Sequence, residues 1–257
     1  MEGMTIPFMK GFFDMAEKAL LVIGASSEVG IKLIKAVHEN YVLIYAHYGR
    51  NDAELLELKK EIGDKLFLIS DDFSLPEAGT GVINAISEKG VWPDHMVHLS
   101  SPKVENIRFR KAKWEDFNKY LQVSLKSAVN VSREVLKHLD KDEREGRIIF
   151  MLSSCVNGIP PKYLSSYVTA KYAMLGLMKA LATEYDSKNI TVNGVSPGMM
   201  ETKFLSDIYD HAIEENAQKS PFGRNLYVDE VIPAFEYLLS DGASKVTGQN
   251  IVVTGGM

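Results

Sequence analysis

A tyrosine, a lysine and a serine between residues 154 and 171 have the types and the spacing needed for proton transfer. Tyr167 and Lys171 are four residues apart, so on a helix their side chains share one face, one turn apart. A phenol has a pKa near 10 in water, and a neighbouring ammonium lowers that pKa toward the range useful for general acid–base catalysis. Ser154 lies thirteen residues before Tyr167, after the apolar run 147–152. A strand that ends beside the start of a helix brings a hydroxyl to a phenol, so these three residues are the candidate catalytic group.

Those residues need a scaffold, and the chain alternates strand-like with helix-like stretches along most of its length. Strand-like apolar runs cover 19–23, 41–48, 66–69, 95–99, 147–152, 191–195 and 251–253. Helix-like stretches cover 31–37, 53–62, 81–87, 114–139, 166–185 and 228–239. This alternation predicts an α/β fold: a single doubly wound Rossmann domain with a mainly parallel sheet of about seven strands, flanked by helices on both faces. The domain covers residues 19–257, and residues 1–18 form an N-terminal extension.

A glycine-rich turn joins the first strand to the first helix. It reads Gly24-Ala25-Ser26-Ser27-Glu28-Val29-Gly30 and ends at a helix N-terminus, where backbone N–H groups and the helix dipole attract a phosphate. Doubly wound sheets bind ligands beyond the carboxyl ends of their strands, where the winding reverses. We therefore expect a nucleotide site at that edge, covered by the segment 199–224 as a lid or substrate wall. Other candidates that directly follow strands are Asp72, Ser100, Ser154 and Pro197-Gly198.

Composition and charge narrow the class of protein. The chain has 257 residues, is 46% hydrophobic and carries a formal net charge of −5, which argues against nucleic acid as a general partner. It has no apolar stretch of membrane-spanning length, and its first residues lack the uninterrupted apolar core of a signal peptide. We expect a cytoplasmic protein without a membrane partner. Phe8, Met9, Phe12 and Phe13 of the extension are expected to pack on the domain or on a partner subunit.

The cysteine and histidine content does not indicate a metal or a disulfide. Cys155 is the only cysteine, and we interpret it as a packing residue rather than a nucleophile because no histidine stands near it in sequence. His95 and His98 share one strand, and their spacing sends them to opposite faces of the sheet. We therefore expect no metal site.

Together these motifs resemble the short-chain dehydrogenase/reductase family, from residue 19 to the C-terminus. The general pattern, including Ser220-Pro221-Phe222-Gly223-Arg224, is most similar to that of 3-oxoacyl carrier-protein reductases. The resemblance rests on an ordered set of motifs: Gly24-Ala25-Ser26-Ser27 with Gly30, Asp72, Ser154, Tyr167-Val168-Thr169-Ala170-Lys171, Asn193-Gly194-Val195-Ser196-Pro197-Gly198 with Thr202, and Thr247-Gly248-Gln249 with Gly255-Gly256.

The resemblance implies an oxidoreductase that transfers a hydride between a nicotinamide cofactor and a carbonyl group. Tyr167 would protonate the ketone oxygen, and Lys171 would hold the ribose hydroxyls and lower the pKa of the phenol. Ser154 would hydrogen-bond the substrate carbonyl. Ser124 stands where relatives have an asparagine that anchors a water in the proton relay. The residues implied to bind the cofactor are Gly24, Ser26, Ser27, Gly30, Arg50, Asp72, Ser100, Tyr167, Lys171, Pro197, Gly198, Met200 and Thr202.

The end of the second strand decides the choice of cofactor. NAD-dependent relatives carry an acidic residue there for the ribose 2′-hydroxyl, whereas a 2′-phosphate needs a cation. This chain has Arg50 and no acid before Asp52, so we expect NADP(H), with NAD(H) as the alternative.

Three departures from the family pattern leave a second interpretation open. Glu28 replaces a glycine of the turn. The stretch His98-Leu99-Ser100-Ser101 stands where relatives have Asn-Asn-Ala-Gly, and Ser124 replaces the asparagine of the proton relay. A nucleotide-binding subunit or sensor without turnover is therefore the alternative to a reductase. An enoyl reductase is disfavoured because those relatives place six residues, rather than three, between tyrosine and lysine.

The expected partners follow from the resemblance and from one basic cluster. The substrate would be a small carbonyl compound or an acyl thioester, with a 3-oxoacyl thioester as the first candidate. Relatives of this kind are dimers or tetramers, so we expect a homodimer or a homotetramer. An acyl carrier protein is a candidate partner for the basic cluster Lys103, Arg108, Arg110, Lys111 and Lys113.

Overall fold

The computed structural model describes residues 18–206 and 210–256, and its centre is a seven-stranded sheet. All neighbouring strands pair in parallel, in the order β3-β2-β1-β4-β5-β6-β7. This topology confirms the predicted doubly wound fold, and the winding reverses between β1 and β4. The strands are β1 (Ala19–Ile23), β2 (Leu43–Tyr48), β3 (Leu66–Ser70), β4 (His95–His98), β5 (Gly146–Met151), β6 (Ile190–Pro197) and β7 (Asn250–Val253).

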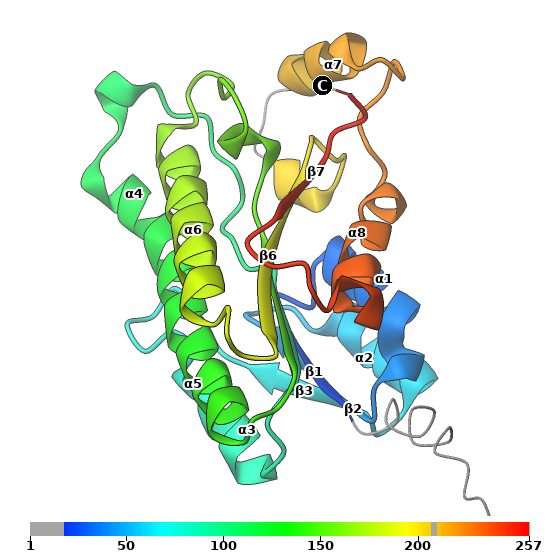
Figure 1. Cartoon of the computed structure of the whole chain (residues 1–257). Helices are drawn as coiled ribbons and strands as arrows, with labels where there is room; N and C mark the ends of the chain where they lie inside the picture. The colour runs from blue at the N-terminus through cyan, green and yellow to red at the C-terminus, as the bar shows by residue number, and fades with distance from the viewer. Residues whose placement is uncertain (1–17, 207–209, 257) are drawn as a thin grey trace, which may run out of the picture.

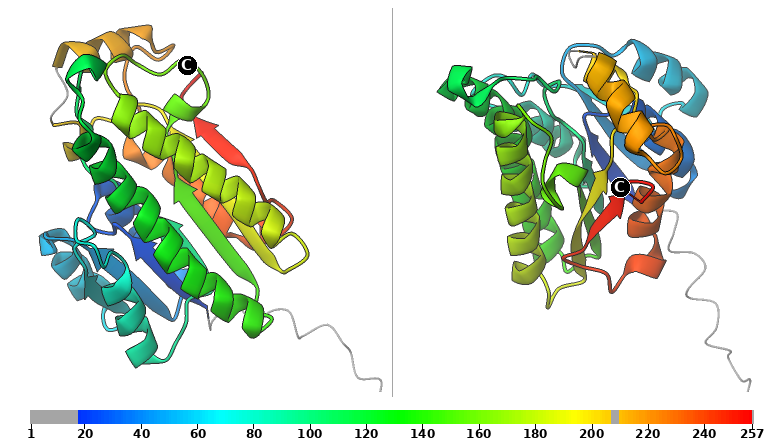
Figure 2. Two further views of the ribbon diagram at one scale, coloured as in Figure 1. Left: turned by 90° about the vertical axis from the view of Figure 1, so that its left-hand side faces the viewer. Right: turned by 90° about the horizontal axis from the view of Figure 1, so that it is seen from above.

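Helices cover both faces of the sheet (Figure 1). Helices α1, α2 and α8 pack on one face, and α3, α5 and α6 pack on the other, with α5 and α6 lying side by side (Figure 2). The helices are α1 (Glu28–Val37), α2 (Ala53–Ile62), α3 (Thr80–Lys89), α4 (Trp114–Tyr120), α5 (Ser127–Lys141), α6 (Ser165–Glu184), α7 (Asp210–Lys219) and α8 (Ile232–Leu239).

The central strand β1 shows why an apolar run is needed here. All five of its residues have no exposed surface, because helices lie over both of its faces. Leu20 and Val22 point into the core under α1 and α8, whereas Leu21 and Ile23 point into the core under α3, α5 and α6. A continuous apolar run, rather than an alternating one, is the pattern such a strand requires.

The stretch 114–139, predicted as one long helix, is divided into three parts. Between α4 and α5 lies a π-helical segment, η4 (Leu121–Lys126). The Ser127 hydroxyl donates to the carbonyl of Val123 at 2.6 Å, and a hydroxyl bonded four residues back favours a bend in a helix. All residues of 114–139 are therefore helical, and the π-helical segment η4 is a local widening within one continuous helical stretch.

The predicted lid segment 199–224 contains two helical pieces above the carboxyl edge of the sheet. These are the short helix η6 (Lys203–Leu205) and α7, which lies at the top of Figure 1 and is seen from above in Figure 2. The extension with Phe8, Met9, Phe12 and Phe13 lies outside the described residues. Within the described ranges, the helices are too short or too polar to cross a bilayer.

Candidate active site

A cavity of about 1610 Å³ opens at the carboxyl edge of the sheet, where the strand order reverses. Every predicted site residue except Gly30 and Ser124 lines it, which brings together positions from residue 24 to residue 202. The predicted residues in its wall are Gly24, Ser26, Ser27, Arg50, Asp72, Ser100, Ser154, Tyr167, Lys171, Pro197, Gly198, Met200 and Thr202.

Tyr167 lies in the first turns of α6 and is buried at the wall of the cavity. Its ring meets the edge of Tyr120 with centroids 5.8 Å apart, and its phenol hydrogen-bonds to the Ser153 side chain. Burial raises the pKa of Tyr167, and the hydrogen bond with Ser153 acts in the opposite direction without offsetting it. The expectation of a lowered pKa is therefore wrong, because desolvation of the phenolate dominates.

Ser153, which directly precedes the predicted Ser154, is the serine that hydrogen-bonds to the phenol. Ser153 continues the extended backbone of β5, with φ −161° and ψ 150°, and its hydroxyl accepts the amide hydrogen of Cys155 at 3.3 Å. Ser154 begins the short helix η5 (Ser154–Val156) and lines the same cavity. The spacing of thirteen residues to Tyr167 selects Ser154 in the sequence. The first hydroxyl after the apolar run 147–152, however, is that of Ser153.

Lys171 lies one turn after Tyr167 and is almost fully buried. Its Nζ donates to the carbonyl of Met151 at 2.9 Å and lies 5.6 Å from the centre of the Tyr167 ring. Burial lowers the pKa of Lys171 from 10.5 to about 8. At neutral pH the amine therefore still carries its proton beside the phenol, as the predicted pairing requires.

The predicted relay residue Ser124 is buried in the π-helical segment η4 and does not line the cavity. Its hydroxyl forms no hydrogen bond with residues 18–206 and 210–256. Close by in the sequence, the hydroxyl of Ser127 accepts a hydrogen bond from Nε2 of His98 at 2.8 Å while donating to Val123. A buried hydroxyl without a protein partner is the kind of group that holds an ordered water, which fits the predicted role.

The glycine-rich turn has the close packing expected of a phosphate cradle. Gly24 has φ +78°, and a Cβ there would lie 3.0 Å from the amide nitrogen of Ser100. A Cβ on Gly30 would lie 2.5 Å from the carbonyl oxygen of Ala25. The Ser27 hydroxyl caps α1 by accepting the amide hydrogen of Gly30 at 3.1 Å. The other amides of the first turn have no intrahelical acceptor, because a helix begins with unpaired N–H groups. This arrangement fits the diphosphate of a dinucleotide.

His47, which the sequence reasoning missed, supports the same turn from β2. Its Nδ1 accepts the amide hydrogen of Gly24 at 3.1 Å, its Nε2 donates to the carbonyl of Asp71 at 2.8 Å, and its ring stacks on Phe73 at 4.1 Å. Burial lowers the pKa of His47, which keeps the ring neutral and Nδ1 free to accept. The only sequence signal was a histidine at an otherwise apolar strand end, which is weak by itself. His95 and His98 point to opposite faces, as predicted.

Two predicted cofactor residues, Arg50 and Asp72, contact each other at the far end of the cavity. Both Nε and Nη2 of Arg50 donate to Oδ2 of Asp72 at 3.1 Å, and 79% of the Arg50 side chain is exposed. The pKa of Asp72 is lowered, mainly by hydrogen bonds from Ser74 and further by Arg50. A cation is therefore held at the rim of the cavity, within reach of solvent.

The residues predicted to contact the nicotinamide end follow β6. The amide of Gly198 donates to the carbonyl of Val253 at 2.8 Å, which places the chain beside the end of β7. Met200 is buried and forms a parallel bridge with Leu226. Thr202 precedes η6 and lines the cavity. Residues 197–200 and Thr202 thus contribute to the wall of the cavity.

Comparisons with known proteins agree with this arrangement. A family model described as enoyl-(acyl carrier protein) reductase matches residues 24–257. The 3-oxoacyl-[acyl-carrier-protein] reductase of Rickettsia conorii (strain ATCC VR-613 / Malish 7) is 30% identical over 247 residues, covering 95% of this chain and 98% of that protein.

Two solved structures are similar over almost the whole chain. A 4-hydroxyisoleucine dehydrogenase complexed with NADH is 26% identical, with a TM-score of 0.82, and covers 93% of this chain and 98% of its own. A variant of actinorhodin polyketide ketoreductase with NADPH is 25% identical, with a TM-score of 0.82, and covers 93% and 97%. The chain therefore belongs to the short-chain dehydrogenase/reductase family and is an NAD(P)-dependent oxidoreductase.

Proposed function

We propose that this protein is an NADP(H)-dependent reductase that converts a ketone to an alcohol, with Tyr167 as the general acid. The observation that carries the proposal is the buried phenol of Tyr167, hydrogen-bonded to Ser153 and one helical turn from Lys171, in the wall of one large cavity. The raised pKa of the phenol keeps its proton in place at neutral pH, which a proton donor requires.

The proposed mechanism assigns one task to each side chain. A bound, reduced nicotinamide would supply the hydride. Tyr167 gives its proton to the carbonyl oxygen, and the Ser153 hydroxyl donates a hydrogen bond to the charge that develops there. The ammonium of Lys171 stabilises the phenolate left behind and passes a proton to it. A water held by Ser124 then returns a proton from solvent to Lys171, so that both Tyr167 and Lys171 regain their protons. We assign the substrate hydrogen bond to Ser153, in place of the predicted Ser154.

The choice of NADP(H) rests on Arg50. Its guanidinium lies at the rim of the cavity beside Asp72, at the end of β2 where the ribose of a dinucleotide is expected. A guanidinium binds a phosphate through two parallel hydrogen bonds, and an exposed arginine is available for this contact. In this proposal Asp72 orients Arg50 until the 2′-phosphate binds.

The proposed substrate is a ketone on an apolar chain, with a 3-oxoacyl thioester as the first candidate. Four apolar residues of the cluster that contains Tyr167 also line the cavity: Cys155, Met199, Phe204 and Leu205. The related Rickettsia protein is named for a substrate carried by acyl carrier protein, and the exposed residues Arg108, Arg110, Lys111 and Lys113 offer a surface for such an acidic partner. A homodimeric or homotetrameric assembly stays a prediction.

The experiment compares wild-type protein with Tyr167→Phe, Ser153→Ala and Ser154→Ala. NADPH oxidation is followed with a panel of ketones that includes a 3-oxoacyl thioester. We expect kcat/KM to fall about 10²- to 10⁴-fold in Tyr167→Phe and about 10²- to 10³-fold in Ser153→Ala, while Ser154→Ala keeps most activity. A large loss in Ser154→Ala with none in Ser153→Ala would reverse the assignment of the serine.

The alternative function is a nucleotide-binding subunit or sensor without turnover. The observation that favours it is the loss of the family's asparagine and glycine at positions 124 and 28, which weakens two supports of catalysis. If wild type and Tyr167→Phe both bind NADPH and neither oxidises it with any ketone of the panel, the sensor is the better description.

A further inference from the structure

We propose that Glu28 is a positioning residue whose carboxylate holds the segment 202–205 over the nucleotide half of the cavity. With Glu54 and Lys203 it forms a three-residue group, which we call the clasp. The clasp would set the dissociation rate of a bound dinucleotide. The inference rests on the proposed function only in assuming that a nicotinamide dinucleotide binds in the cavity beside the glycine-rich turn.

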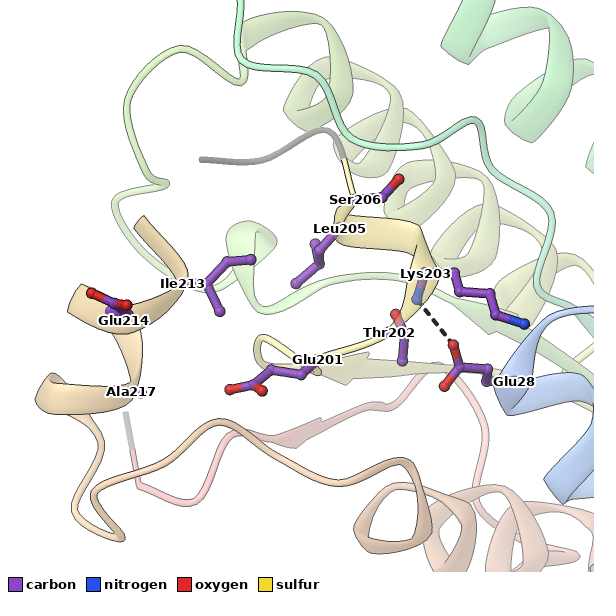
Figure 3. A pocket seen from close by; sticks show the side chains of 9 residues that line it. All are labelled: Glu28, Glu201, Thr202, Lys203, Leu205, Ser206, Ile213, Glu214 and Ala217. Carbon is purple, nitrogen blue, oxygen red and sulfur yellow. Dashed lines mark hydrogen bonds between the residues drawn. The ribbon is translucent and has the colours of Figure 1, made fainter. Parts of the chain in front are cut away.

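The first contact of the clasp joins α1 to the segment after β6. Glu28 is the first residue of α1, and its Oε1 accepts the backbone amide hydrogen of Lys203 at 2.9 Å (Figure 3). The two residues are 175 positions apart in the sequence. One oxygen of the carboxylate is thereby bound to the segment.

The second contact adds the neighbouring helix α2. Nζ of Lys203 donates to Oε1 of Glu54, in the first turn of α2, at 2.8 Å. The side chains are 80% and 46% exposed, so solvent screens this pair. Lys203 therefore binds a carboxylate through its backbone and another through its side chain, and it bridges two helices of the nucleotide-binding half.

The segment borders two hollows. One is the large cavity, and the other is a second hollow of about 610 Å³, whose lining side chains are drawn in Figure 3. Thr202, Lys203 and Leu205 line both hollows. Other attachments of the segment include the packing of Phe204 and Leu205 in the cluster with Tyr167, and Lys103 donates to Ser206 at 2.8 Å just after it. The hydrogen bond from the Lys203 amide to Glu28 joins this wall directly to the first residue of α1.

The charge and the hydrogen bond of Glu28 have opposite effects on a bound diphosphate. The negative charge at the N-terminus of α1 repels a phosphate, whereas the hydrogen bond keeps the wall closed over it. Glutamine at position 28 keeps an acceptor for the Lys203 amide and removes the charge. Alanine removes both. The pair of variants Glu28→Gln and Glu28→Ala therefore separates the two effects.

The first measurement is NADPH dissociation, followed by stopped-flow fluorescence in wild type and variants. We expect Glu28→Ala and Glu54→Gln to raise the dissociation rate about two- to fivefold, the range for an exposed charged pair. Glu28→Gln is expected to lower the dissociation constant, since it removes only the repulsion. The control is Glu57→Gln, because Glu57 lies on the same helix as Glu54 but pairs with Lys60 at 2.6 Å. It should leave both quantities unchanged.

The second measurement needs no cofactor. Trypsin cleaves after Lys203 only when the segment opens locally, so the cleavage rate reports the closed fraction of the clasp. We expect this rate to rise about two- to fivefold in Glu28→Ala and to stay at the wild-type value in Glu57→Gln. Unchanged cleavage and unchanged NADPH dissociation in Glu28→Ala would overturn the clasp. If wild type binds no NADPH but the cleavage rate still responds, the clasp stands and the proposed function fails.

Discussion

Two buried histidines, His95 and His98, predict a steep loss of stability in mild acid. His98 is buried and donates to the hydroxyl of Ser127. Burial is the main cause that lowers its pKa to about 3, and the charge of Lys171, which disfavours the protonated ring, acts in the same direction. His95 is buried against the Tyr41 hydroxyl, and burial likewise lowers its pKa to about 3. Both rings are therefore neutral in the folded protein at any pH above about 4.

The size of the effect follows from proton linkage. In the unfolded chain each ring has its ordinary pKa of 6.5, so below pH 6.5 the unfolded state binds more protons and gains stability relative to the fold. At pH 5, 1.5 pH units at 1.36 kcal/mol each give about 2 kcal/mol lost for each histidine. The value is almost unchanged if the folded pKa is 4 instead of 3, since the native ring stays neutral at pH 5 either way. The lowered pKa of His47 acts in the same direction.

The assay is urea unfolding at pH 8 and at pH 5, followed by circular dichroism and by fluorescence. The free energy of unfolding of wild type should fall by at least about 4 kcal/mol between the two pH values. His98→Asn, which removes the titrating ring, should reduce this fall by about 2 kcal/mol whatever its own stability at pH 8. His95→Gln should do the same, and the double variant should combine both effects. An equal fall in wild type and in His98→Asn would show that His98 is protonated in the fold, and the reasoning from burial would be refuted.

Three further predictions test the site. The pKa of Lys171, about 8, predicts that ketone reduction falls as the pH rises through 8, because a neutral amine no longer stabilises the phenolate; Lys171→Arg, measured in the same pH series, should lack this fall. Gly30→Ala should abolish measurable NADPH binding and lower the melting temperature, because its Cβ would lie 2.5 Å from the Ala25 carbonyl oxygen; Gly176→Ala, where a Cβ meets nothing within 4 Å, is the matched control and should do neither. Arg50→Ala should raise the dissociation constant of NADPH by about tenfold or more, and that of NADH by less than about threefold, in a fluorescence titration. Equal changes for both cofactors would remove Arg50 from the choice between them.

The sequence by itself determined the fold and the neighbourhood of the site. Buried parallel strands need continuous apolar runs such as 19–23, and a strand, a glycine-rich turn and a helix follow one another within residues 19–37. The four-residue spacing of Tyr167 and Lys171 places both on one face of a helix. These features depend on residues that are close in the sequence, so a local pattern is enough to find them.

Only the tertiary structure decided which atoms meet at the site and what their environment does to them. The hydrogen bond between Ser153 and the Tyr167 phenol depends on where β5 ends relative to α6, and the raised pKa of Tyr167 depends on burial by elements far away in the chain. The support of Gly24 by His47 and the tie from Glu28 to Lys203 join residues 23 and 175 positions apart. Desolvation and long-range hydrogen bonds arise from the whole packed chain, and for this reason no local pattern could predict them.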